Sequence, residues 1–386
     1  MEETTVLVVG AGPAGLGIAA CLTKKFIPYI ILEKEDCCAS LWKKRTYDRC
    51  HLHLAKEFCS LPLKPHTPHA KKYLGKDDFI DYIDEYVSAF NIRPRYFNSV
   101  ESASFDEATG KWLVETKNTL QKVTIVFVAR FLVIATGENG KGYVPDIPGL
   151  KDFKGDVLHS SEYKSGREFQ DKNVLVVGCG NSGMEISYDL CNSGADTSIV
   201  IRNPVHVVTR EIVFVGMHLL KYFSLSIVDP LITFSSKLMY GNLSKYGIHR
   251  PNEGPFFLKA TRGRSPVIDV GTIDKIQSGE IKVLPRIVSI NKSKVIFEDK
   301  VELEFDAIIF ATGYKSTTCE WLKDYDSILK DDGFPKNRFP NHWKGKNGSY
   351  CIGLSRMGLQ GVSKDAIVIA NDIDIVLKTM VVPKEF

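Results

Sequence analysis

The sequence predicts an α/β fold built from two similar units, one inserted into the other, and three observations support this prediction. Two glycine loops of the form G-x-G-x-x-G each follow directly on a short apolar run, Thr5–Val9 and Asn173–Val177. A stretch of helix-forming composition follows each loop. Two further apolar runs, Phe131–Ile134 and Phe305–Phe310, both end in Ala-Thr-Gly, one before the second loop and one after it. The order strand, glycine loop, helix, strand is typical of a Rossmann-like, dinucleotide-binding domain.

The first loop consists of Gly10, Ala11, Gly12, Pro13, Ala14 and Gly15. Its glycines permit a tight turn and a close approach of the backbone to a pyrophosphate. The predicted helix Leu16–Lys24 offers free amides and the positive end of its dipole to the phosphates. The next strand, Tyr29–Leu32, ends at Glu33, where a carboxylate is expected to bind ribose hydroxyls. Because a carboxylate repels a 2′-phosphate, the predicted ligand is FAD or NAD rather than NADP.

The second loop consists of Gly178, Cys179, Gly180, Asn181, Ser182 and Gly183. A helix is predicted over Met184–Cys191 and a strand over Thr197–Ile201. That strand is followed by Arg202, at the place where the first unit has its acid. An arginine there can stabilise the 2′-phosphate of NADP through charge-assisted hydrogen bonds, so we expect NADPH at this loop. The alternative is that Arg202 is only a solvated charge at the end of a strand and contacts no nucleotide. His206 could assist Arg202, although a histidine in a loop more often has no such role.

The two Ala-Thr-Gly ends suggest where the chain crosses between domains. Small residues at the end of a buried strand allow another backbone or a ligand to pass closely. We therefore expect an FAD-binding domain formed by residues 1–165 and 301–386, with an NADPH-binding domain, residues 166–300, inserted into it.

Composition favours a soluble enzyme of a reducing compartment, and we expect a cytoplasmic location. The net charge of +4 is small for 386 residues and the basic residues are dispersed, which argues against nucleic acid as a partner. The nine cysteines show no C-x-x-C and no metal-ligand spacing. The first strand begins almost at the N-terminus, so no signal peptide is expected. The most apolar window, Ile212–Tyr240, is interrupted by charges and a proline, which predicts amphipathic helices rather than a transmembrane span. Such helices could cover a substrate channel, contact a membrane surface or simply pack.

Further motifs carry a family resemblance. The segment Phe153–His159 has the pattern F-x-G-x-x-x-H and is followed by an aromatic residue, Tyr163. Together with the two loops, Glu33 and the Ala-Thr-Gly ends, it resembles the flavin-containing monooxygenases, and more specifically the plant YUCCA enzymes. The supporting stretches are Leu41–Arg49, Leu52–Pro62, Ala135–Asn139, Val267–Gly271 and Gly361–Ala366.

The resemblance implies an FAD-dependent monooxygenase that consumes NADPH and dioxygen. It implies oxidative decarboxylation of indole-3-pyruvate to indole-3-acetate, a step of auxin biosynthesis, through a flavin peroxide. The cofactor would supply the reactivity, and the protein would supply orientation, a dry cavity and hydrogen bonds. This chemistry requires no Ser-His-Asp triad, carboxylate pair or metal cluster, and the sequence suggests none.

The chain departs from the family pattern beside the flavin. Many members place an asparagine near the reactive edge of the flavin, followed by Gly-Pro-Lys. This sequence has His53 there, followed by Leu-Ala-Lys. His53 is our candidate catalytic residue, because it could hydrogen-bond the flavin or its peroxide; the alternative is a packed structural histidine. Trp42 could contact the flavin or belong to the core. His159 of the identifying motif is expected to fix the connection between the domains.

Other functions share this loop arrangement. A disulfide reductase of the thioredoxin-reductase kind needs a redox cysteine pair, and the lack of C-x-x-C argues against it. An N- or S-oxygenating enzyme or a Baeyer–Villiger monooxygenase would use the same two nucleotides. A non-catalytic redox sensor that binds both nucleotides without turnover is the alternative from a different class.

Overall fold

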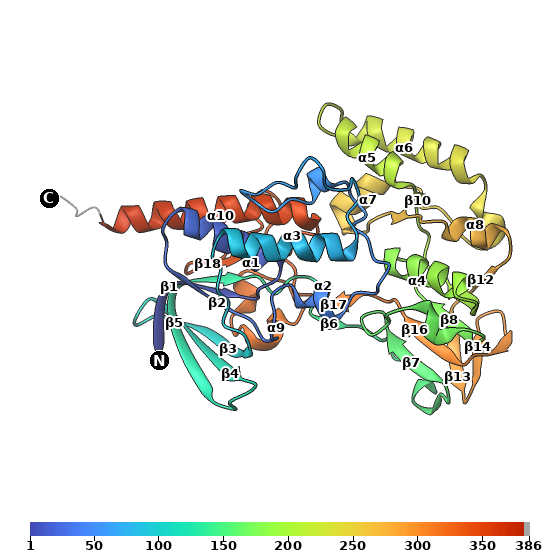
Figure 1. The fold of residues 1–386 in the computed structure, drawn as a ribbon, viewed down its shortest axis with the longest axis horizontal. Helices are drawn as coiled ribbons and strands as arrows, with labels where there is room; N and C mark the ends of the chain where they lie inside the picture. Colours follow the sequence, from blue (N-terminus) through green and yellow to red (C-terminus); the bar gives the residue numbers. More distant parts are fainter. Residues whose placement is uncertain (382–386) are drawn as a thin grey trace. The chain divides into compact units, whose positions relative to one another are not determined.

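The computed structural model describes residues 1–381, which divide into two compact units (Figure 1). The first unit contains residues 1–44, residues 56–141 and the chain from Tyr314 onward, and the second contains residues 45–55 and 142–313. The chain therefore crosses between the units shortly after each Ala-Thr-Gly end. The limits differ from the expected 165/166 and 300/301. The reason is that strands β7 (Asp156–His159) and β16 (Ala307–Phe310), which lie outside the expected range, belong to the sheet of the second unit.

The first unit is built on a sheet with the strand order β2-β1-β5-β4-β3, in which β18 also pairs with β5. Its strands are β1 (Glu2–Val9), β2 (Tyr29–Leu32), β3 (Asn98–Asp106), β4 (Lys111–Asn118), β5 (Thr124–Ile134) and β18 (Ser349–Cys351). Strand β1 is parallel to β2 and β5, whereas β3, β4 and β5 run antiparallel. The predicted strands Thr5–Val9 and Tyr29–Leu32 are confirmed. The last four residues of β1 are buried, as expected for the centre of a parallel sheet.

The longest helices of the first unit are α1 (Pro13–Lys24), α3 (Lys76–Ala89) and α10 (Gly358–Val381), and α1 packs against α10 (Figure 1). Helix α1 buries nine consecutive residues, Ala14–Leu22, because it is apolar or small on every side. The shorter elements are α2 (Ser40–Lys44), α9 (Thr318–Trp321) and the 3₁₀ turns η1 (Lys56–Phe58) and η5 (Tyr325–Ser327).

The second unit contains a five-stranded, fully parallel sheet with the order β12-β9-β8-β16-β7. The strands not yet introduced are β8 (Asn173–Val177), β9 (Asp196–Val200) and β12 (Ile281–Leu284). A small antiparallel sheet follows, made of β13 (Ile287–Asn291), β14 (Lys294–Phe297) and β15 (Glu302–Glu304). Strands β10 (Val207–Val208) and β11 (Val267–Ile268) form a parallel pair. Two short strands, β6 (Lys141–Gly142) and β17 (Tyr314–Lys315), lie at the two ends of the main segment of the second unit, residues 142–313.

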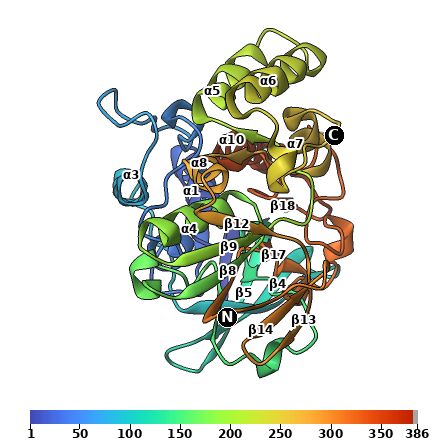
Figure 2. The same cartoon turned by 90° about the vertical axis from the view of Figure 1, so that its right-hand side faces the viewer.

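The helices of the second unit are α4 (Asn181–Asn192), α5 (Arg210–Leu219), α6 (Leu225–Tyr240), α7 (Pro255–Arg262) and α8 (Thr272–Gln277). Its 3₁₀ turns are η2 (Leu150–Asp152), η3 (Gly166–Phe169) and η4 (Leu243–Tyr246). The predicted helical character of 212–240 is confirmed: α5 and α6 pack against each other, and α7 packs on α6 (Figure 2). Among the residues that the structure describes, we find no helix with the length and apolar character needed to cross a bilayer.

Candidate functional site

The first glycine loop joins β1 to α1. Its three glycines differ in what a side chain at their position would meet. Gly10 has φ +106°, and a Cβ on it would lie 2.6 Å from the carbonyl oxygen of Ala135. A Cβ on Gly15 would collide with the carbonyl of Gly10. A Cβ on Gly12 would meet no described atom within 4 Å. The protein's own packing thus requires the first and third glycines, whereas the second leaves open space at the N-terminus of α1, where a pyrophosphate would lie.

The second loop, between β8 and α4, repeats this arrangement. Gly178 has φ +111°, and its Cβ would lie 2.6 Å from the carbonyl oxygen of Ala311. A Cβ on Gly183 would collide with the carbonyl of Gly178, and a Cβ on Gly180 would again find no described atom within 4 Å. The alanine of each Ala-Thr-Gly end therefore abuts the first glycine of a loop. The Cβ of the same alanine lies 3.6 Å from the Cβ position of Gly15 in the first loop and 3.4 Å from that of Gly183 in the second.

The two helices that follow these loops begin in the same way. The N-cap residue is Gly12 in α1 and Gly180 in α4, and a glycine has no side chain with which to bond the first-turn amides. Those amides therefore stay available for an anion. Pro13 occupies the first helical position of α1, where its missing N–H costs nothing. Ala14 is buried, and Ser182 lies in the first turn of α4.

Residues of opposite charge follow β2 in the first unit and β9 in the second, the strands that come after the helix of each glycine loop. Glu33 comes directly after β2, is 6 % exposed, and accepts hydrogen bonds from the amides of Ala11 at 2.8 Å and Glu35 at 3.0 Å. The carboxylate therefore contacts the first glycine loop itself. Arg202 comes two residues after β9 and is exposed. Among residues 1–381 its side chain has no hydrogen-bond or ion-pair partner.

A second arginine near the second loop was not predicted from the sequence. Burial raises the pKa of the Cys179 thiol, and the positive charges of Arg264 and Arg202 oppose that rise, so both guanidinium groups act on this loop. Arg264 donates to the carbonyl of Pro204 at 2.9 Å. It lies 62 positions after Arg202 in the chain, too far for any local motif to reveal it. His206, in contrast, is 3 % exposed and hydrogen-bonds the carbonyl of Glu253 at 2.7 Å, so it is a structural histidine.

Trp42, on α2, is partly buried. Its ring meets that of Phe79 edge to face, with 4.6 Å between the centroids. The contact that the structure shows is therefore with α3, as expected for a core residue.

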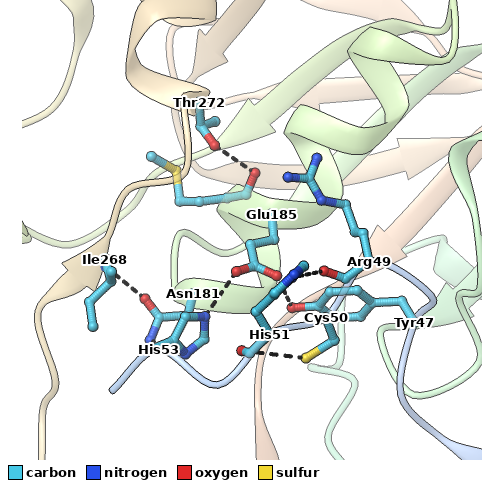
Figure 3. Close-up of polar contacts among 10 residues, drawn as sticks. Tyr47, Arg49, Cys50, His51, His53, Asn181, Glu185, Ile268 and Thr272 are labelled. Atoms are coloured by element: carbon cyan, nitrogen blue, oxygen red, sulfur yellow. Dashed lines mark hydrogen bonds and ion pairs between the residues drawn. The ribbon is translucent and has the colours of Figure 1, made fainter. Parts of the chain in front are cut away.

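His53 belongs to the segment 45–55, which is part of the second unit although it comes early in the chain. Its Nε2 lies 3.0 Å from Oε1 of Glu185, and its Nδ1 lies 3.4 Å from Nδ2 of Asn181 (Figure 3). The side chain of His53 is 23 % exposed, whereas that of Glu185 is 2 % exposed. Since Asn181 belongs to the second glycine loop, the structure places His53 directly beside that loop.

Glu185 is the residue that the sequence reasoning missed. Its Oε2 accepts a hydrogen bond from the hydroxyl of Tyr47 at 2.9 Å (Figure 3). Burial by itself would raise the pKa of this carboxyl. The hydrogen bond from His53, the positive charge that its ring carries when protonated, the hydrogen bond from Tyr47 and the charge of Arg49 together lower the pKa below its ordinary value. Glu185 is thus an ionised, buried acid. The available signal was a charged residue in α4 between the apolar Met184 and Ile186.

His159 lies at the end of β7, and its ring lies close to both ends of the segment 142–313. Its Nε2 is 3.0 Å from the carbonyl oxygen of Gly313, and a Cβ on Gly142 would lie 2.5 Å from its Nδ1. These two glycines are the last and the first residues of the main segment of the second unit. The role of His159 in fixing the connection between the domains stays a prediction. Within residues 1–381, no three His, Cys, Asp or Glu side chains gather closely enough to hold a metal ion.

Each unit carries one glycine loop of the dinucleotide-binding kind, placed between a strand of its sheet and the helix that follows, so the chain is a protein with two dinucleotide-binding domains. A model described as flavin-binding monooxygenase-like matches residues 3–354. A probable indole-3-pyruvate monooxygenase of Arabidopsis thaliana, YUCCA10, is 55% identical over 98% of this chain and 99% of its own length. Rice YUCCA1, an indole-3-pyruvate monooxygenase, is 46% identical over 95% and 90% of the two chains.

The solved structures show the same fold. The complex of OTEMO with FAD and NADP superposes with a TM-score of 0.74 at 16% identity, over 98% of this chain and 85% of that chain. The chain therefore belongs to the flavin-binding monooxygenase-like family and, within it, to the YUCCA proteins.

Proposed function

We propose that this protein is an FAD- and NADPH-dependent monooxygenase that converts indole-3-pyruvate to indole-3-acetate. The reaction consumes one NADPH, one proton and one dioxygen, and it releases carbon dioxide, water and NADP⁺. The observation that carries the proposal is the pair of equivalent loops with a buried glutamate beside one and an exposed arginine beside the other. The substrate follows from the similarity to the Arabidopsis and rice YUCCA proteins, which are named as indole-3-pyruvate monooxygenases.

The residues of the first unit fit FAD. The open space over Gly12 admits the pyrophosphate, and the uncapped amides of α1 would bond it. Glu33, already bonded to the loop amide of Ala11, would accept from the ribose hydroxyls. FAD supplies hydride acceptance and oxygen activation, which amino-acid side chains do not supply.

The residues of the second unit fit NADPH. The open space over Gly180 and the amides of α4 repeat the features of the first loop. Arg202 and Arg264 bring two positive charges that a 2′-phosphate would neutralise. We further propose that His53 acts in the reaction by hydrogen bonding, and its contact with the buried Glu185 supports that role.

The test is turnover of the purified, flavin-loaded protein. Incubation with NADPH, dioxygen and indole-3-pyruvate should give indole-3-acetate, identified by mass spectrometry, together with one NADPH oxidised per acid formed. Amine, sulfide and ketone substrates serve as comparisons for N-oxygenation, S-oxygenation and Baeyer–Villiger activity. Acid formation that is slower than oxidation of one of these substrates would overturn the substrate assignment. NADPH oxidation that fails with every substrate would indicate the redox sensor instead.

We also propose that the protein is cytoplasmic and contacts membrane surfaces through α6. The inner face of α6 packs through Val228, Ile232 and Tyr240, yet its outer face is apolar as well. Four outer residues are at least half exposed and follow each other at spacings of three or four: Ile227, Leu231, Phe234 and Leu238. Between residues 220 and 245 the lysines 221, 237 and 245 are exposed, and the one acid, Asp229, is buried against amides of α7. This combination fits an anionic lipid surface.

Vesicle flotation tests the membrane contact. The protein should float with vesicles that contain phosphatidylserine and stay unbound with pure phosphatidylcholine. The double variant Phe234→Gln and Leu238→Gln should bind about 10-fold more weakly, because two exposed apolar side chains lose their burial in lipid. Leu120→Gln, an equally exposed leucine in the first unit, is the matched control. Equal flotation of the double variant and the control would refute the membrane contact. The cytoplasmic location is tested separately, by finding the fraction in which a tagged protein appears after cell fractionation.

A further inference from the structure

An unbroken line of hydrogen bonds runs through the second unit from the backbone of β11 to a buried tyrosine (Figure 3). The amide of Ile268 donates to Oδ1 of Asn181 at 2.8 Å, and Nδ2 of Asn181 faces Nδ1 of His53 at 3.4 Å. On its other side, His53 Nε2 contacts Glu185 at 3.0 Å, and Tyr47 donates to the same carboxylate at 2.9 Å. The line joins residues from three separate parts of the sequence: the segment 45–55, helix α4 and strand β11.

The directions of these bonds follow from the end at Ile268. A backbone amide can only donate, so the atom of Asn181 that faces Ile268 is the oxygen, and its amino group faces His53. An amino group can only donate, so Nδ1 of His53 accepts. A neutral imidazole carries one proton, which then lies on Nε2, the atom that faces Oε1 of Glu185 at 3.0 Å and donates to it. The contact with Asn181 therefore selects the tautomer of His53, and a carboxylate acceptor at Glu185 matches it.

A second acid on the same helix shows what a purely structural carboxylate does here. Asp189 lies one turn after Glu185 in α4 and accepts hydrogen bonds from the hydroxyl of Tyr163 at 2.6 Å and the amide of Gly166 at 2.8 Å. Like Glu185, it has a tyrosine donor and holds a separate chain segment against α4. Unlike Glu185, it has no histidine partner among these contacts. The difference between the two acids is the imidazole of His53.

We propose that Glu185 is a positioning residue for His53: it fixes the orientation of the imidazole and keeps the proton on Nε2, so that Nδ1 is held toward the Asn181 amide of the second glycine loop. The contact of Tyr47 with the other carboxylate oxygen keeps Glu185 itself in place. Any effect on catalysis rests on the proposed function, because His53 can influence the reaction only if the protein is a flavin monooxygenase. The structural part of the proposal does not depend on it.

The experiment compares Glu185→Gln with Asp189→Asn in the flavin-loaded protein. Glutamine keeps the size of the side chain and removes the charge of the carboxylate that accepts from Nε2. Four quantities are measured for each variant: the flavin content, the thermal midpoint, the hydrogen peroxide released per NADPH oxidised, and the ¹⁵N signals of His53. His53→Gln identifies the signals that belong to this ring.

We expect both variants to keep flavin and to lose some thermal stability. Only Glu185→Gln should shift the ¹⁵N signals of His53 away from the Nε2–H pattern. Only Glu185→Gln should raise the peroxide released, by roughly tenfold, the size expected when one charge-assisted hydrogen bond is lost. Tyr47→Phe should change the ¹⁵N signals of His53 and the peroxide released in the same direction but by less, and Tyr163→Phe should change neither.

Two outcomes overturn the proposal. If Glu185→Gln lowers the thermal midpoint as Asp189→Asn does while the His53 signals and the peroxide yield stay unchanged, Glu185 is only a structural clamp. If the unmodified protein already shows the Nδ1–H pattern, the assigned directions are wrong. Absence of acid formation by the unmodified protein would contradict the proposed function alone, since the ¹⁵N signals would still report on the positioning.

Discussion

Replacing Arg202 with alanine should weaken NADPH binding and leave NADH binding and folding unchanged. The side chain is exposed, and within residues 1–381 no hydrogen bond or ion pair engages it. The substitution therefore removes no interaction on which the fold depends, and any effect on stability should be within about 0.5 kcal/mol. NADH lacks the 2′-phosphate, so it gives Arg202 no group to stabilise.

The expected size of the effect follows from the exposure of the arginine. Hydrogen bonds to charged groups contribute about 1.5–3 kcal/mol, which is roughly 10- to 150-fold in affinity. Solvent screens an exposed guanidinium, so we expect the lower end, about a 10-fold rise in the Kd for NADPH. The charge of Arg264 also acts on this loop, so it should retain part of the preference. The double variant Arg202→Ala and Arg264→Ala should lose most of it.

The assay is nucleotide titration of the flavin-loaded protein, followed by intrinsic fluorescence, with NADPH and NADH in parallel. Flavin absorbance reports cofactor content, and the thermal midpoint reports folding. Arg338→Ala, an exposed arginine of the first unit, is the control for a general loss of positive charge. Working at two salt concentrations separates the local contact from long-range attraction, because only the latter is strongly screened.

Equal affinity of the unmodified protein for NADH and NADPH would refute the reasoning, because the residue that discriminates would then be absent or elsewhere. A loss of NADH affinity as large as that of NADPH in Arg202→Ala would also contradict it, since it would show that the arginine acts on a part common to both nucleotides.

Three further predictions concern the other parts of the site. Gly12→Val should fold and purify without its yellow colour, because the side chain fills open space meant for a pyrophosphate; Gly15→Val should not fold, because its Cβ collides with the carbonyl of Gly10. Normal flavin content in Gly12→Val, by absorbance, would remove the first assignment. His53→Ala should raise NADPH oxidation relative to acid formed, and unchanged coupling would return His53 to a structural role. Finally, the folded-state pKa of Glu185 is lowered, so its contribution to stability is fully present above the unfolded value of about 4.3 and is lost as the pH falls through the lower folded value. Urea unfolding between pH 7 and 3 should therefore show a smaller acid-side loss for Glu185→Gln than for the unmodified protein, and parallel curves would contradict this.

The sequence by itself determined the elements whose signals are local. The strand Tyr29–Leu32 and the strand Asn173–Val177 are found with the predicted limits, because a short run of β-branched and apolar residues needs no distant partner to be recognised. The three glycines of each loop were also identified from spacing alone. Glu33 lies beside its loop because β2 pairs in parallel with β1, with Leu32 opposite Val9, so both strands end at the same edge of the sheet.

Only the tertiary structure decided which distant residues meet. Glu185 contacts His53, 132 positions away in the chain, and no periodicity connects an acid of α4 with the segment 45–55. The same holds for the membership of that segment in the second unit and for the charge of Arg264 at the second loop. The physical reason is that hydrogen bonding and burial depend on separation in space, whereas a sequence motif records only separation along the chain. A loop that binds one phosphate is contiguous and can be recognised from its residues. A histidine whose proton is fixed by a buried carboxylate becomes visible only after folding.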